Sequence, residues 1–247
     1  MYKLKFAEGS DVVFTTYFNS KQNPQAAHST FTFAPKDKIN YIFPWFASVL
    51  FHKLNAVIIH DGLSTDFIQK YENEHVQFVY YKPEKYSLND ARFFALNHIL
   101  TENRLGKVLL TDGSDILIKE NPFDFMTNPA LLYFGSDEPN LPRIRDNAWC
   151  IQKLTTLSEH SCIQLTEDVL DFEYINAGVY GGFYENLKAF NEALTILFDQ
   201  LNSEANNNMM AINYLLWKFK VQHFKGQPFT SPFKRFELHG DYVIVHK

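Results

Sequence analysis

Short apolar runs alternate with helix-like stretches along the first half of the chain. The apolar runs are DVVFTTYF, AVIIHDG, VQFVYY and KVLLTD (residues 11–18, 56–62, 76–81 and 107–112). Their nearly continuous apolar character is typical of parallel strands that are buried on both faces. Between them, Ser64 is placed to cap one helix, and Ser87 or Asn89 to cap the next. This alternation predicts an α/β fold, with a mostly parallel sheet and helices on both of its faces.

The second half of the chain combines longer amphipathic helices with strands that contain glycine. The run ENLKAFNEALTILFDQLN (residues 185–202) places a large apolar residue at every third or fourth position, which predicts a helix with one buried face. A further helix is expected at 207–219, and strands are expected at 131–139, 174–183 and 241–247. Because no linker or repeat interrupts these elements, we expect a single domain over residues 1–247.

Composition narrows the class of protein. Apolar residues make up 46% of the chain and charged residues 21%, a balance that allows a substantial core. The net charge is -5 and lysine and arginine form no cluster, which argues against a nucleic-acid partner. The longest apolar stretch, residues 41–51, is too short to span a bilayer and predicts no transmembrane segment. With only two cysteines and no visible secretory signal, we expect a cytoplasmic protein, for which peripheral membrane contact remains open.

Carboxylates follow the apolar runs at the points where strands are expected to end. Asp61 follows the second run, and Asp112 and Asp115 follow the fourth, with only Gly-Ser between them. The first run ends near Thr15, Thr16 and Tyr17. In open α/β sheets, ligands bind outside the carboxyl ends of the strands, and paired carboxylates with phosphates suit Mg²⁺ or Mn²⁺. The other interpretation is that Asp-Gly-Ser-Asp is simply a turn, since all four residues favour turns.

Arg92 favours the ligand-binding interpretation. It lies four positions before Leu96, and therefore on or beside the apolar face of its predicted helix. A partly buried guanidinium requires an anionic partner, which could be Asp112, Asp115 or a bound pyrophosphate. The alternative is a structural ion pair with a surface carboxylate.

Five segments in a fixed order carry a resemblance to a known family. They are IIHDGLS, YSLNDARFFALNHIL with GKVLLTDGSDILIKENPF, YINAGVYGG, NNNMMAIN and YVIVHK. Together they resemble the GT-A nucleotide-sugar glycosyltransferases, in the neighbourhood of family 8, the glycogenin and galactosyltransferase-like group. The resemblance covers nearly the whole chain and implies the GT-A fold, with a mostly parallel central sheet flanked by helices.

The resemblance also implies a metal site. Asp115 matches the second aspartate of the family's D-x-D motif, and His246 matches its third ligand, for Mn²⁺ or Mg²⁺. Gly113 falls where the first aspartate is expected, and Asp112 lies one position earlier, which gives D-x-x-D. A shift of one residue along a strand turns a side chain to the opposite face unless the turn compensates. His223, at the start of HFKGQPF, is a rival to His246.

Further residues are assigned by the same matches. Asn176 and Asn208 fall at the catalytic end of the site, although Asn208 stands where the family has an acidic residue and Met209 where it often has glutamine. The residues expected to bind the nucleotide-sugar donor are Thr15, Thr16, Tyr17, Asp61, Arg92, Gly178 and Lys247.

The implied activity is transfer of a hexosyl group from a nucleotide-diphosphate donor, with a UDP-sugar favoured, to a glycan, lipid-linked or protein acceptor. Family likeness implies retention of the anomeric configuration and a role in polysaccharide biosynthesis. The departures at Gly113 and Asn208 leave open a catalytically inactive relative that binds sugar nucleotides. A haloacid-dehalogenase-type phosphatase is a more distant alternative, because LLTDGSD is loosely similar to a strand ending in D-x-D. That family places its aspartate after the first strand, whereas three strands are expected before Asp112.

Overall fold

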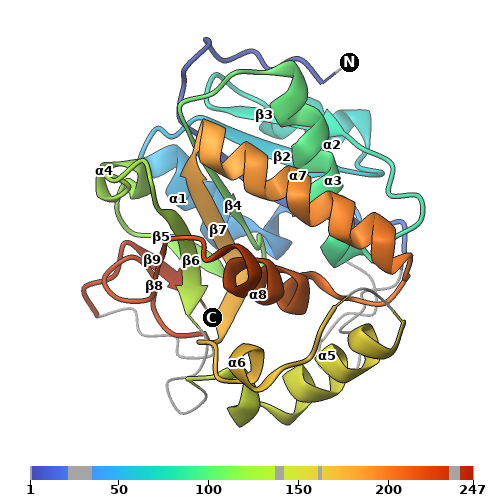
Figure 1. The fold of residues 1–247 in the computed structure, drawn as a ribbon. Helices are drawn as coiled ribbons and strands as arrows, with labels where there is room; N and C mark the ends of the chain where they lie inside the picture. Colours follow the sequence, from blue (N-terminus) through green and yellow to red (C-terminus); the bar gives the residue numbers. More distant parts are fainter. Residues whose placement is uncertain (1, 22–34, 137–141, 161–162, 234–239, 247) are drawn as a thin grey trace.

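The computed structural model describes residues 2–21, 35–136, 142–160, 163–233 and 240–246 (Figure 1). Its strands are β1 (Val12–Tyr17), β2 (Ala56–His60), β3 (Val76–Tyr80), β4 (Lys107–Thr111), β5 (Ile116–Ile118), β6 (Leu132–Ser136), β7 (Ile175–Phe183), β8 (His223–Lys225) and β9 (Ile244–His246). Its helices are α1 (Phe43–Phe51), α2 (Thr65–Tyr71), α3 (Leu88–Glu102), α4 (Pro122–Phe125), α5 (Ala148–His160), α6 (Glu167–Leu170), α7 (Tyr184–Leu201) and α8 (Asn208–Phe219). Short 3-10 helices lie at Ile39–Tyr41 and Ile144–Asp146.

A seven-stranded sheet with the order β3-β2-β1-β4-β7-β6-β8 forms the centre of the structure. Strands β3, β2, β1 and β4 are parallel, β7 runs antiparallel to both β4 and β6, and β8 is parallel to β6. A second, two-stranded sheet pairs β5 with β9 in antiparallel fashion. The predicted α/β architecture with a mostly parallel sheet is therefore confirmed.

The two faces of the sheet carry separate hydrophobic cores. Successive side chains along a strand alternate between faces, so Val12 and Phe14 of β1 pack into one core and Val13 into the other. Helices α3, α7 and α8 cover the first face, and α1 and α2 cover the second (Figure 1). Both faces of β1, β2 and β4 are thereby buried, which explains why their sequences are apolar almost throughout.

The structure confirms the serine N-caps that the sequence predicts for two helices. The Ser64 side chain accepts a hydrogen bond from the N–H of Phe67 (3.2 Å), and Ser87 accepts one from Asp90 (3.1 Å). Of the two caps proposed for α3, Ser87 is therefore the one used.

Helix α1 was not predicted as a helix. It is apolar over its whole length, FPWFASVLF, so it shows no alternation of polar and apolar faces from which a helix could be read. Its proline lies in the first turn, where a missing N–H costs nothing. In the part of the chain that the structure describes, no helix is long and apolar enough to cross a membrane.

Candidate functional site

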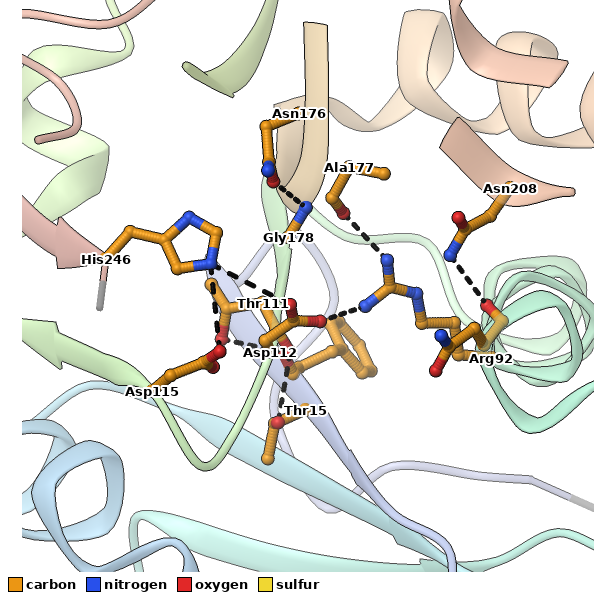
Figure 2. A network of polar contacts seen from close by, with 12 residues as sticks. Thr15, Arg92, Thr111, Asp112, Asp115, Asn176, Ala177, Gly178, Asn208 and His246 are labelled. Atoms are coloured by element: carbon orange, nitrogen blue, oxygen red, sulfur yellow. Dashed lines mark hydrogen bonds and ion pairs between the residues drawn. The ribbon is translucent and has the colours of Figure 1, made fainter. Parts of the chain in front are cut away.

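A pocket opens where β1 and β4 end, between the first turns of α3 and α8. It is lined by Thr16, Phe18, Tyr41, Leu88, Asn89, Arg92, Asp112, Gly113, Ser114, Asp115, Asn176, Ala177, Gly178, Asn208, Met209, Phe233 and His246. Figure 2 shows its central polar network, in which residues that are far apart in the sequence converge. The position at the carboxyl ends of parallel strands is the one that the sequence predicts for a ligand site.

Asp112, Asp115 and His246 form a cluster that could hold a metal ion. One ligand atom from each lies within 4.8 Å of the others. The Nε2 atom of His246 is 3.8 Å from Oδ2 of Asp112 and 4.0 Å from Oδ2 of Asp115. Two ligands that each make bonds of about 2.1 Å to an octahedral cation lie about 3 to 4.2 Å apart, so both separations fit one ion. The two carboxylates suit Mn²⁺ or Mg²⁺, and the imidazole favours Mn²⁺ over the harder Mg²⁺.

Asp112 is directed toward the α3 side of the sheet by the alternation of β4. Val108 and Leu110 point into the core beneath α3, and Asp112 continues this series two positions beyond Leu110. There it forms an ion pair with Nη1 of Arg92, whose Nη2 donates a hydrogen bond to the carbonyl of Ala177 (2.8 Å). Arg92 is only 5% exposed, so these acceptors compensate a nearly buried charge. Of the partners expected for Arg92, Asp112 is the one in contact.

A side chain has little room at Gly113, the position where the D-x-D motif has its first aspartate. A Cβ atom at Gly113 would lie 2.7 Å from Oγ1 of Thr15 and 3.1 Å from Cγ2 of Ile42. A side chain at this position would therefore run into the end of β1 instead of the pocket. Asp112 reaches the pocket because its backbone N–H is fixed by the carbonyl of Gly178 (2.8 Å). Asp112 therefore reaches the pocket although it lies one residue before the position of the first aspartate in the D-x-D motif.

Strand β7 presses closely against the cluster. Asn176 accepts a hydrogen bond from the N–H of Gly178 (2.7 Å), which fixes the backbone between them. A Cβ atom at Gly178 would lie 2.4 Å from Cε1 of His246 and 2.7 Å from Oδ2 of Asp112. The absence of a side chain at position 178 is therefore what allows the histidine and the carboxylate to approach one another.

Ser231 fixes the backbone of His246 by hydrogen bonds, and no sequence motif marks this serine. The backbone N–H of His246 donates to Oγ of Ser231 (2.8 Å), and this hydroxyl donates to the carbonyl of His246 (3.3 Å). The pairing of β9 with β5 places His246 opposite Ile116, the residue after Asp115. Ser231 and His246 are both completely buried, so the orientation of the imidazole is closely constrained.

Tyr41 is a pocket residue that sequence reasoning missed. It lies in the 3-10 helix before α1, within the long apolar stretch, and only the folded chain brings it to the pocket. Burial raises the pKa of Tyr41, and the charges of Asp115 and Asp112 raise it further, against the effect of a hydrogen bond with Ser114. The phenol therefore stays protonated at neutral pH and can donate a hydrogen bond to an anionic ligand.

Several predicted donor-binding residues serve other contacts in the structure. The hydroxyl of Thr15 donates to the carbonyl of Thr111 (3.0 Å), and that of Tyr17 to the carbonyl of Lys38 (2.9 Å). The carboxylate of Asp61 accepts hydrogen bonds from the backbone N–H groups of residues 19 (2.8 Å) and 20 (3.0 Å), and so fixes the segment after β1. Of these strand-end residues Thr16 lines the pocket. Lys247 lies outside the described residues.

His223, the rival to His246, lies elsewhere. Its Nε2 atom is hydrogen-bonded to Oε1 of Glu173 (2.9 Å), and its Nδ1 atom is 2.9 Å from the carbonyl of Val221. Lys225 pairs with the other oxygen of Glu173 (2.9 Å). The hydrogen bond from His223 is the main cause that lowers the pKa of Glu173 to about 2. Burial lowers the pKa of His223, but its bonds to Glu173 and Val221 outweigh burial and raise it overall.

This cluster gives a pH-dependent contribution to stability. Because its folded pKa is lowered from 4.5 to about 2, Glu173 stabilises the fold above pH 4.5 and loses this effect as the pH falls toward 2. Because its pKa is raised above 6.5, His223 contributes fully below pH 6.5 and loses its effect as the pH rises through the raised value. The Glu173→Gln variant should therefore differ most from the wild type between pH 4.5 and 6.5. We expect a difference of less than about 1 kcal/mol, because the pair is partly solvated.

Urea unfolding at several pH values measures this difference. Glu185→Gln is the matched control, because Glu185 forms an exposed, long ion pair with Arg104 (3.6 Å). A Glu173→Gln effect that is the same at pH 3, 5.5 and 9 would contradict the assignment.

Comparisons with known proteins define the fold. No family model matches the chain, and no curated protein matches it in sequence. Solved structures do match, among them a crystal structure of an active-site mutant of LgtC, a GT-A galactosyltransferase of family 8. The alignment covers 96% of this chain and 86% of that one, with a TM-score of 0.55 and 14% sequence identity. At this identity the likeness establishes the fold alone. The chain has the GT-A fold, as its sequence resemblance implies.

Proposed function

We propose that this protein is a metal-dependent glycosyltransferase that moves a hexosyl group from a nucleotide-diphosphate donor to a glycan, lipid-linked or protein acceptor. The observation that carries the proposal is the cluster of Asp112, Asp115 and His246, whose ligand atoms lie within 4.8 Å of one another beside the buried Arg92. This cluster stands at the carboxyl ends of the strands in a GT-A fold. The sequence resemblance to the family 8 group favours a UDP-sugar as the donor.

The chemistry that such a site must supply is stabilisation of a leaving diphosphate. Negative charge grows on the phosphate oxygen as the bond to the sugar breaks, and preorganised positive charge lowers the barrier. Arg92 provides a cation that Asp112 and the Ala177 carbonyl hold in one orientation. When bound by Asp112, Asp115 and His246, Mn²⁺ or Mg²⁺ would supply Lewis-acid neutralisation of the same charge. We assign phosphate contacts also to Lys247.

The sugar end of the pocket offers neutral groups. Asn176 and Asn208 carry amides, which orient sugar hydroxyls by hydrogen bonds and do not act as bases at neutral pH. Met209 lies beside them in the pocket lining. An enzyme with retention of configuration is the form of the reaction that family likeness favours, and Asn176, Gly178 and Asn208 are its sugar-facing residues in this proposal.

A second function has one observation in its favour. Asn208 and Met209 line the pocket where the family has an acidic residue and often a glutamine. A catalytically inactive protein that binds sugar nucleotides would tolerate this replacement. The haloacid-dehalogenase alternative is not retained, because the chain has the GT-A fold.

Donor binding should require a divalent cation. Two phosphate groups beside Asp112 and Asp115 repel these carboxylates unless a cation lies between them. We expect calorimetric titration with UDP or GDP to show binding in Mn²⁺ and no measurable binding in EDTA. At a concentration of about 100 Kd, the bound nucleotide should stabilise the fold by about 2.7 kcal/mol.

Two outcomes separate the candidate functions. Equal affinity in Mn²⁺ and EDTA would remove the metal from the proposal. If sugar nucleotides bind with Mn²⁺ but neither transfer nor hydrolysis of the donor follows, the protein is a binder and not an enzyme.

A further inference from the structure

Asp90 is a completely buried carboxylate that lies behind the pocket wall. It belongs to the first turn of α3, two residues before Arg92, and has no exposed surface. Both of its oxygens accept a hydrogen bond from the backbone N–H of Asn207, at 3.2 and 3.1 Å. The backbone of Asn208 is hydrogen-bonded to the same carboxylate. A buried charge is costly, so its partners indicate what it does.

At the start of α8, Asp90 binds backbone N–H groups that have no acceptor within the helix. The first N–H groups of a helix have no acceptor within the helix and are usually satisfied by the side chain of the N-cap residue. In α8 the N-cap, Asn207, makes no such bond, and its side chain donates to the carbonyl of Ala205 instead (2.9 Å). From a different helix, Asp90 instead supplies the acceptor for the N–H of the N-cap residue Asn207 itself. The positive end of the α8 dipole in turn compensates the carboxylate.

This connection joins the two walls of the pocket. Arg92 and Asn89 line the α3 wall, and Asn208 and Met209 line the α8 wall. The side chain of Asn208 also donates to the carbonyl of Asn89 at 3.4 Å, a contact that is long and weak by itself (Figure 2). Asp90 is therefore the strongest described link between the first turns of α3 and α8. Burial raises the pKa of Asp90 to about 7, against the effect of the hydrogen bonds from Asn207, Ser87 and Asn208 and of the charge on Arg92.

We propose that Asp90 is a positioning residue of the donor site, which fixes the first turn of α8 so that Asn208 and Met209 face the sugar of a nucleotide-sugar donor. The inference rests on the proposed function and deepens it. Asp90 is not part of the pocket lining and acts through the α8 backbone. The nucleotide diphosphate is held by Arg92 and by the proposed metal ligands, so it should bind independently of this link.

The test compares binding of the nucleotide with binding of the nucleotide sugar. The probes are UDP, UDP-galactose, UDP-glucose and GDP-mannose with Mn²⁺, titrated into the wild type, Asp90→Asn, Asp90→Ala and Asn208→Ala. Asp199→Asn is the matched control, because it removes one exposed carboxylate, which accepts a hydrogen bond from Tyr86. Amide hydrogen exchange at residues 207–210 reports on the first turn of α8 without any ligand.

In Asp90→Asn we expect UDP affinity to stay within about twofold of the wild type, while affinity for the preferred sugar nucleotide falls about 10-fold. Exchange at residues 207–210 should become faster in this variant and remain unchanged in Asp199→Asn. Because Asp90 acts through Asn208 and its neighbours, the double variant Asp90→Asn/Asn208→Ala should lose less than the sum of the two single losses. Asp90→Asn keeps one acceptor, so it remains informative if Asp90→Ala fails to fold.

Two results would overturn the inference. Equal losses for UDP and for the sugar nucleotide would show that Asp90 is a general structural residue. Unchanged sugar-nucleotide affinity, or unchanged exchange at residues 207–210, would show that α8 does not depend on it. If the wild type binds none of the probes, the proposed function fails, and the exchange measurement alone then decides whether Asp90 holds α8.

Discussion

The Gly178→Ala substitution is expected to weaken metal binding severely and to abolish the proposed sugar transfer while the protein remains folded. A Cβ atom at this position would lie 2.4 Å from Cε1 of His246, 2.7 Å from its Nε2 atom and 2.7 Å from Oδ2 of Asp112. These atoms are the ends of side chains and not backbone, so they can move aside. Their displacement destroys the ligand geometry and costs about 1–3 kcal/mol of stability, the usual effect of overpacking.

The measurement is titration of Mn²⁺ by calorimetry, with thermal unfolding followed in parallel. We expect Mn²⁺ affinity to fall by about 100-fold, because disturbing the groups that orient metal ligands lowers metal affinity by up to about this factor. Gly135→Ala is the matched control on the neighbouring strand β6, where a Cβ atom would meet its nearest neighbour at an ordinary 3.5 Å. Wild-type Mn²⁺ affinity in Gly178→Ala would mean that the ion does not bind between His246 and Asp112.

The elements of the first half of the chain could be predicted because their signals are local. Strands buried on both faces leave continuous apolar runs, and Ser64 and Ser87 cap the helices that they precede. The direction of β7 could not be predicted in the same way. Its residues are typical of a strand, but its antiparallel pairing with β4 and β6 depends on contacts between residues at least 39 positions apart. Helix α1 was not predicted, because a helix without a polar face has no amphipathic pattern.

The candidate site could be predicted only as far as its motif residues. Asp112 and Asp115 follow the end of β4 and His246 is the last residue of β9, and the structure brings them together. Ser231, Tyr41 and Asp90 carry no motif, and only the tertiary structure shows that they hold or line this site. Thr15, Tyr17 and Asp61 stand at strand ends as well but make contacts away from the pocket lining, because a strand end directs successive side chains to different faces.

Gly113 illustrates how sequence and structure complement each other. A motif comparison records Gly113 as a missing aspartate and Asp112 as a displaced one. In the structure the position of Thr15 leaves no room for a side chain at 113, and the alternation of β4 carries Asp112 toward α3. The D-x-x-D spacing is therefore compatible with a complete ligand set and is not by itself a sign of lost function.

Replacement of His246 should abolish Mn²⁺ binding and sugar transfer, whereas replacement of His223 should leave both intact. The Nε2 atom of His246 lies 3.8 and 4.0 Å from carboxylate oxygens of Asp112 and Asp115, while that of His223 is bound to Glu173. His246→Gln retains most of the side-chain volume but removes the imidazole nitrogen, so loss of binding is separated from loss of packing. The backbone bonds between residue 246 and Ser231 do not involve the imidazole and remain in this variant.

The two histidines also predict opposite patterns of stability. His246→Gln should unfold in EDTA at nearly the wild-type temperature but gain nothing from added Mn²⁺. His223→Ala should keep the stabilisation by Mn²⁺ and lose the contribution of the Glu173 pair, which is largest between pH 4.5 and 6.5. Thermal unfolding of both variants, with and without Mn²⁺ at pH 5.5 and pH 8, distinguishes the two patterns. Mn²⁺ stabilisation that survives in His246→Gln and disappears in His223→Ala would transfer the third ligand to His223, and the metal site would then lie beside Glu173 rather than at the end of β4.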